Sequence, residues 1–275
     1  MISKNSSLIK DVIDYMKVKL KANLIAVYGI GSHFDDSLPE NFRTNDIDLI
    51  AIVKFSTRGI VNKEVFVGYN TIESYNNKEL FEKSSGANYE WALICIKHPE
   101  NSKLLYGTDI RDQIPETSNI QFDYDNILIR GFYHLEKSFE IVQKDLAKAK
   151  REYSKAMFKF GYYFCVLHDT SFRYVSLTEI RKRLEKLYRP DTNERQTFIY
   201  FEKAFEYRLK GDFDSDFYKL QFKTRYYLIS LLRNGKTHRL MNLKEIKSFF
   251  SSYFGGLPIL KVFIRNLGIK RHLKN

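Results

Sequence analysis

The chain has 275 residues, of which 44% are hydrophobic and 28% charged, a composition typical of globular proteins rather than disordered ones. Its formal net charge is +12 at pH 7. No run approaches about 20 consecutive apolar residues, so the sequence predicts no membrane-spanning helix. The N-terminus is polar and lacks a secretory signal, and both cysteines, Cys95 and Cys165, lie in apolar stretches. We therefore expect a cytoplasmic protein with reduced, buried cysteines.

The first half of the chain carries both helical and strand patterns. Apolar residues at helical spacing predict helices over 8–22 and 71–83. Short runs of branched and aromatic residues predict strands over 24–28, 47–53, 64–69 and 89–97. This order of elements predicts a small domain with a mixed sheet.

The second half shows helical periodicity and almost no strand pattern. Ser176 with Glu179 has the form of a capping box and should start a helix, and Asn242 with Glu245 resembles another helix start. The remaining helices are expected over 127–150, 152–167, 194–209 and 217–232. The fold class predicted is α+β, with a mixed-sheet domain at 1–118 followed by an all-α helical bundle at 119–275.

The two halves differ in charge. Residues 1–125 contain 14 Lys and Arg against 18 Asp and Glu, a net charge of −4. Residues 126–275 contain 31 against 15, a net charge of +16. A basic half of this kind favours a polyanionic partner such as RNA. The alternative is a lysine-rich helical surface that only contacts solvent.

Two carboxylates on one predicted strand indicate a metal site. Asp46 and Asp48 are two residues apart, so on a strand their side chains project from the same face. Adjacent carboxylates repel each other, and a divalent cation between them removes that cost. Hard oxygen ligands suit Mg²⁺, which also keeps waters and substrate phosphate oxygens in its shell. The alternative is an Asp pair that caps a neighbouring loop.

The predicted strand 24–28 is followed by Gly31 and Ser32, which should open a turn or a helix. Unpaired backbone N–H groups at such a turn can face an anion, glycine lets a phosphate approach the backbone, and serine adds a hydroxyl donor. We therefore predict that Gly31 and Ser32 bind the phosphates of a nucleotide, beside the metal.

A third carboxylate is expected on a neighbouring strand. Glu90 stands at the head of the predicted strand 89–97, where it would complete a second metal site or accept the proton of an attacking hydroxyl. Glu64 and Glu73 are weaker rivals, and the alternative for Glu90 is an acid exposed at a strand end.

The run Ile30-Gly31-Ser32 followed by Asp46-Ile47-Asp48 resembles the signature of the DNA polymerase beta-like nucleotidyltransferase superfamily, over about residues 8–110. The resemblance implies transfer of a nucleoside monophosphate from an NTP such as ATP to a hydroxyl group, with release of pyrophosphate. It also implies two Mg²⁺ ions, which Mn²⁺ could replace. A catalytic domain followed by a helical domain is similar to aminoglycoside nucleotidyltransferases.

The resemblance leaves the acceptor open, because fold does not determine substrate. The basic second half favours RNA, such as a tRNA end. A small molecule such as an aminoglycoside, or a protein hydroxyl, are the alternatives, and a cationic drug would require an acidic pocket. Oligomeric state is not predicted.

Two weaker patterns lie in the second half. Lys155 and Lys159, four residues apart on a predicted helix, are candidates for binding the nucleotide, although such a pattern is more often a solvated face. Arg233 and His238 have the spacing of the HEPN family of helical ribonucleases, a spacing that also arises by chance. Two further alternatives are therefore a ribonuclease and an RNA-binding protein without catalysis.

Overall fold

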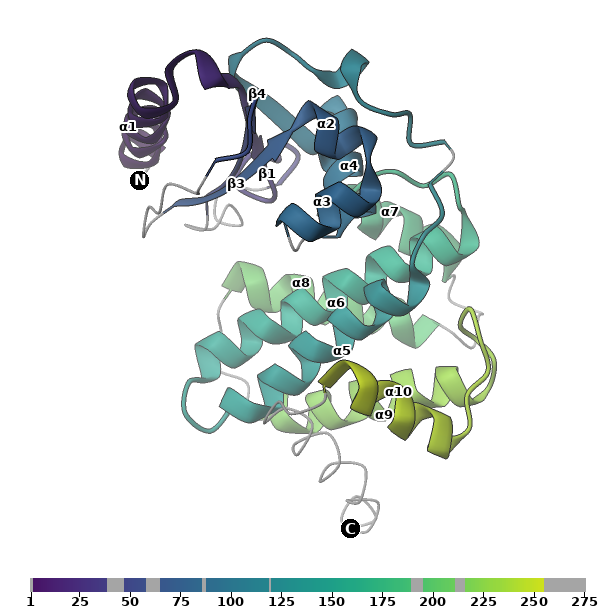
Figure 1. The fold of residues 1–275 in the computed structure, drawn as a ribbon. Coiled ribbons are helices and arrows are strands. Elements are labelled where there is room, and N and C mark those ends of the chain that lie inside the picture. The colour runs from purple at the N-terminus through teal and green to yellow at the C-terminus, as the bar shows by residue number, and fades with distance from the viewer. Residues whose placement is uncertain are drawn as a thin grey trace. The chain divides into compact units, whose positions relative to one another are not determined.

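The computed structural model describes residues 2–38, 47–57, 65–85, 88–118, 120–188, 195–210 and 216–254. The chain forms two compact units, drawn together in Figure 1. Unit 1 comprises Met1–Phe122 and Ser171–Glu179, and unit 2 comprises Asp123–Thr170 and Ile180–Asn275. The sequence assigned the segment Ser171–Glu179 to the helical half, whereas in the structure it belongs with the sheet.

Unit 1 contains a four-stranded mixed sheet. Strand β1 pairs antiparallel with β2 on one side and with β4 on the other, and β3 pairs parallel with β2, which gives the order β3-β2-β1-β4. The strands are β1 (Leu24–Ile30), β2 (Ile47–Val53), β3 (Val65–Thr71) and β4 (Ser102–Gly107). The predicted mixed sheet is confirmed, although β4 was missed.

Both faces of the sheet are covered, because the two central strands are apolar on both sides. Tyr28 and Ile52 belong to a core cluster with side chains of α2, α3 and α4. Val27 and Leu49, which point to the opposite face, belong to a second cluster with α1. These helices are α1 (Ile2–Leu20), α2 (Ile72–Asn76), α3 (Lys78–Ser85) and α4 (Tyr89–Lys97), with short 3₁₀ turns at Lys21–Asn23, Pro99–Asn101 and Arg111–Gln113.

The segment Tyr89–Lys97 is a helix, so the predicted strand there was wrong. The side chain of Asn88 accepts a hydrogen bond from the backbone N–H of Trp91 at 2.9 Å and caps the helix. Ala92 to Ile96 are all buried. A segment that is buried on every side is apolar throughout, and such a run has no period that separates helix from strand.

The described secondary structure of unit 2 is helical, and the α+β fold class is confirmed. Asn242 accepts from the N–H of Glu245 at 3.0 Å, while Glu245 accepts from the N–H of Asn242 at 2.7 Å, and this capping box stands at the predicted helix start. The predicted break near 151 lies instead at 142–145, where Asp145 caps the next helix. The helices are α5 (Tyr124–Ile141), α6 (Leu146–His168), α7 (Leu177–Leu187), α8 (Arg195–Lys210), α9 (Phe217–Arg233) and α10 (Leu243–Phe254).

Two predictions from composition can be compared with the structure. Cys95 and Cys165 are buried and form no disulfide. None of the helices in the described ranges combines the length and the apolar character that a membrane crossing requires.

Candidate functional site

The backbone leaves β1 through a tight turn at Gly31. The φ angle of Gly31 is 79°, a conformation that side chains with a Cβ rarely adopt. The N–H of Phe34 donates to the carbonyl of Gly31 at 3.1 Å and closes the turn. The turn predicted from Gly31 and Ser32 is therefore present.

Gly29 explains why this turn carries a second glycine. A Cβ on Gly29 would lie 2.6 Å from the ring atoms of Phe34, so any side chain there would displace the ring. The ring of Phe34 folds back over the end of β1 and packs against the core cluster on the α1 side. Because residue 29 is glycine, the ring of Phe34 can pack directly over the end of β1.

Asp48 lies next to this turn. In the antiparallel pairing of β1 with β2, Asp48 is the strand partner of Ile30. A Cβ built on Gly31 would be 3.6 Å from Oδ2 of Asp48. The half-buried carboxylate and the glycine backbone therefore border the same small space. A missing side chain beside a carboxylate is the arrangement that a phosphate and a hard cation need.

Asp46, the other predicted metal ligand, lies outside the described residues, as does Asn45. Within the ranges that the structure describes, no three His, Cys, Asp or Glu residues form a group that could hold a metal ion. Carboxylate oxygens suit Mg²⁺ or Mn²⁺, and Asp48 fits the role of a ligand by its place beside Gly31.

Glu90 lies in a different setting from the one predicted. It belongs to the first turn of α4 and not to a strand, and only 5% of the residue is exposed. Its carboxylate forms an ion pair with Lys78 and accepts a hydrogen bond from Nδ2 of Asn88 at 2.9 Å. The carboxylate is therefore engaged at the start of its own helix.

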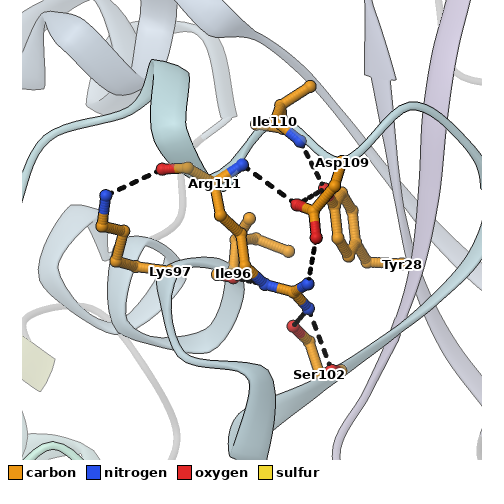
Figure 2. Close-up of polar contacts among 7 residues, drawn as sticks. All are labelled: Tyr28, Ile96, Lys97, Ser102, Asp109, Ile110 and Arg111. Carbon is orange, nitrogen blue, oxygen red and sulfur yellow. Dashed lines mark hydrogen bonds and ion pairs between the residues drawn. The ribbon is translucent and has the colours of Figure 1, made fainter.

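Hydrogen bonds among Tyr28, Asp109 and Arg111, which we call the bracket, hold the chain segment that follows β4 (Figure 2). The phenol of Tyr28 donates to Asp109 at 2.9 Å and accepts from the N–H of Ile110 at 2.9 Å. Burial raises the pKa of Tyr28 to about 12, and the adjacent Asp109 carboxylate contributes. Arg111 pairs with Asp109 and donates to the carbonyl oxygens of Ile96 and Ser102. Sequence patterns did not reveal this bracket, because its members come from separate segments.

A cavity of about 520 Å³ opens in unit 1 beyond the turn. Four of its lining residues are acidic and one is basic, and Asp36 pairs with that base, Lys103, at 3.3 Å. The lining residues are Phe34, Asp35, Asp36, Ser37, Pro99, Glu100, Ser102, Lys103, Tyr174, Ser176 and Glu179. The sequence did not predict the cavity, because one wall comes from a segment about 140 residues away in the chain.

That wall is tied to the rest of unit 1 by hydrogen bonds between side chains and the backbone. Nδ2 of Asn101 donates to the carbonyl of Arg173 at 2.8 Å, and Oδ1 of Asn101 accepts from the N–H of Val175 at 3.0 Å. The guanidinium of Arg173 donates to the carbonyl of Thr117 through Nε at 3.0 Å and Nη2 at 2.8 Å. Asn101 and Arg173 are buried, so these bonds fix the segment firmly.

The two predicted nucleotide-binding lysines, Lys155 and Lys159, lie on α6 of unit 2. Both are partly buried. Their charges lower the pKa of His134 on α5, after the larger effect of burial, so the two lysines stand close to that histidine.

The predicted ribonuclease pair also lies in unit 2. His238 uses both ring nitrogens, with Nδ1 2.7 Å from the hydroxyl of Tyr163 and Nε2 2.7 Å from Oδ1 of Asp125. Its ring also stacks on Tyr124, with centroids 5.6 Å apart. Arg233 is exposed at the end of α9. A histidine held in this way has no ring nitrogen available for a substrate, which disfavours the ribonuclease alternative.

No model of a protein family matches the chain, and no curated protein matches it. Among solved structures, the chain is similar to spectinomycin adenyltransferase AAD(9) from Enterococcus faecialis, determined with ATP and spectinomycin. The TM-score is 0.50 at 13% identity, and the match covers 82% of this chain and 98% of that chain. The fold is therefore nucleotidyltransferase-like.

Proposed function

We propose that the chain is a metal-dependent nucleotidyltransferase that moves a nucleoside monophosphate from an NTP to a hydroxyl acceptor. The acceptor oxygen would form a bond to the α-phosphorus as the bond to the bridging oxygen breaks, and pyrophosphate would leave. The observation that carries the proposal is the place of Gly31, whose absent side chain borders the Asp48 carboxylate. The backbone of the turn would hold the phosphates of the NTP through Gly31 and Ser32.

Asp46 and Asp48 would hold the metal, with two Mg²⁺ ions expected and Mn²⁺ as an alternative. When bound, the metal supplies positive charge that stabilises the attacking and leaving oxygens. The role of the protein is then to position the phosphates and the acceptor, which is the main source of catalysis in phosphoryl transfer.

The third carboxylate is better assigned to Glu64 than to Glu90. Glu64 lies outside the described residues, but in the chain it immediately precedes Val65. Val65 is the parallel strand partner of Ile47, and Ile47 immediately follows Asp46. Glu90, in contrast, is already paired with Lys78.

RNA is the acceptor that the charge distribution favours. Residues 126–275 carry a net charge of +16, which attracts a polyanion and disfavours a cationic substrate. The second candidate acceptor is a small amine-bearing alcohol, and the acidic cavity of unit 1 specifically supports it. Asp35, Asp36, Glu100 and Glu179 would attract ammonium groups there, with Lys103 opposing them. The solved structure of AAD(9) holds ATP together with spectinomycin. A protein hydroxyl remains a third candidate without a specific observation.

The deciding experiment offers each of four α-labelled NTPs with Mg²⁺ to total tRNA, to lysate protein and to a panel of aminoglycosides and aminocyclitols. Wild type and Asp48→Asn are compared, because the amide keeps the size of the carboxylate but removes its charge. Label that moves to one acceptor class in wild type and not in the variant supports the proposal and identifies the acceptor. Absence of transfer from every NTP to every class, in a protein that binds RNA, would favour the RNA-binding alternative.

A further inference from the structure

Helices α5 and α6 of unit 2 pack against each other, and Nζ of Lys137 on α5 lies 3.6 Å from the carboxylate of Glu152 on α6. Lys155 and Lys159 lie four residues apart on α6, a spacing that places them on one face of the helix. Both act on the charge of His134, the α5 residue that contacts Glu152. We call Lys137, Lys155 and Lys159 the α5–α6 basic face.

The carboxylate of Glu152 does not cancel the charge of this face. Glu152 is almost buried, with 7% of its side chain exposed, and its oxygens lie 2.8 Å from Nδ1 of His134 and 3.6 Å from Nζ of Lys137. The three lysines outnumber this carboxylate and leave an excess of positive charge. The carboxylate itself holds α5 to α6 through His134 and Lys137.

We propose that the α5–α6 basic face binds the phosphate backbone of RNA. Lys155 and Lys159 are about 6 Å apart along the α6 axis, and Lys137 adds a third positive charge from α5. Cations spread over two helices suit a run of successive phosphates better than one compact anion. The proposal deepens the proposed function, since it rests on RNA as the acceptor and names the surface that receives it.

His134 couples this surface to pH. It faces Glu152, Lys155 and Lys159 of α6, and on its own helix it lies between Tyr133 and Lys137. Burial lowers the pKa of His134 below its ordinary 6.5, and Lys159 and Lys155 lower it further, while Glu152 raises it. A bound phosphate would favour the protonated ring, so RNA binding takes up a proton and the affinity rises as the pH falls toward the lowered pKa of His134. His134→Asn keeps a donor near the Nδ1 position and should flatten this dependence.

The test measures binding of a fluorescent tRNA by anisotropy at several salt concentrations. The variant is Lys155→Gln with Lys159→Gln. The matched control is Lys219→Gln with Lys223→Gln, two exposed lysines with the same spacing on α9 of the same unit. We expect the α6 variant to lower the slope of log affinity against log salt by about 1.4–1.8, and the affinity at about 0.1 M salt by at least tenfold. The control should change neither by more than about a third as much.

Equal losses in both variants, or no RNA binding in wild type, would overturn the inference. Binding of ATP with Mg²⁺ to the same proteins is measured by calorimetry. If the α6 variant loses ATP affinity and keeps RNA affinity, the face serves the nucleotide and the inference fails. Asp48→Asn separates this failure from failure of the proposed function, because it should abolish transfer of label and leave tRNA binding intact.

Discussion

Replacing Gly31 with alanine tests the turn at the centre of the candidate site. The φ angle of 79° is unfavourable for alanine by about 1–2 kcal/mol. Steric conflict adds little, because the nearest atom to the new Cβ is Oδ2 of Asp48, at an ordinary contact distance of 3.6 Å. The loss of folding stability should therefore be about 1–2 kcal/mol.

Gly31→Ala should weaken nucleotide binding by more than the backbone strain alone would. The new methyl group would occupy the space between the backbone of the turn and the Asp48 carboxylate, where the phosphates are proposed to approach. We therefore expect the affinity for ATP with Mg²⁺, measured by calorimetry, to fall at least about tenfold, equivalent to about 1.4 kcal/mol.

Gly235 provides the matched control. Its φ angle is 66°, and a Cβ there would lie 3.7 Å from Cδ1 of Leu240, so Gly235→Ala introduces similar backbone strain in unit 2. Both variants should lower the thermal midpoint of their unit by a few degrees, but only Gly31→Ala should lose ATP affinity. Equal ATP affinity in the two variants would refute the assignment of the turn as the phosphate site.

Three further predictions concern other parts of the structure. Tyr28→Phe strands the buried N–H of Ile110, so we expect a loss of about 1–3 kcal/mol and faster hydrogen exchange at that amide; unchanged exchange would contradict the bracket. Arg225→Leu leaves the buried Glu136 carboxylate without its cation and should cost about 3–5 kcal/mol in denaturant unfolding; adding Glu136→Leu should restore most of the loss. In the labelled transfer assay, Glu64→Gln should lower the rate at least about a hundredfold while Glu90→Gln retains most of it; the reverse order would return the third carboxylate to Glu90.

The sequence by itself determined the local features of this protein. The apolar runs around Val27 and Leu49 identified the two central strands, and Gly31 identified the turn between them. Helical periodicity identified the second half, and Asn242 with Glu245 identified the start of α10. Each of these depends on residues a few positions apart, so the period and the capping chemistry are visible along the chain.

Tertiary structure decided what depends on burial and on distant partners. The segment around Glu90 is a helix, which its sequence did not reveal because an enclosed helix is as uniformly apolar as an enclosed strand. The hydrogen bonds among Tyr28, Asp109 and Arg111 join segments that share no sequence pattern. The same is true of the cavity wall that Asn101 holds. Their carboxylates and amides are ordinary polar residues in the sequence, and only folding brings them to the same place.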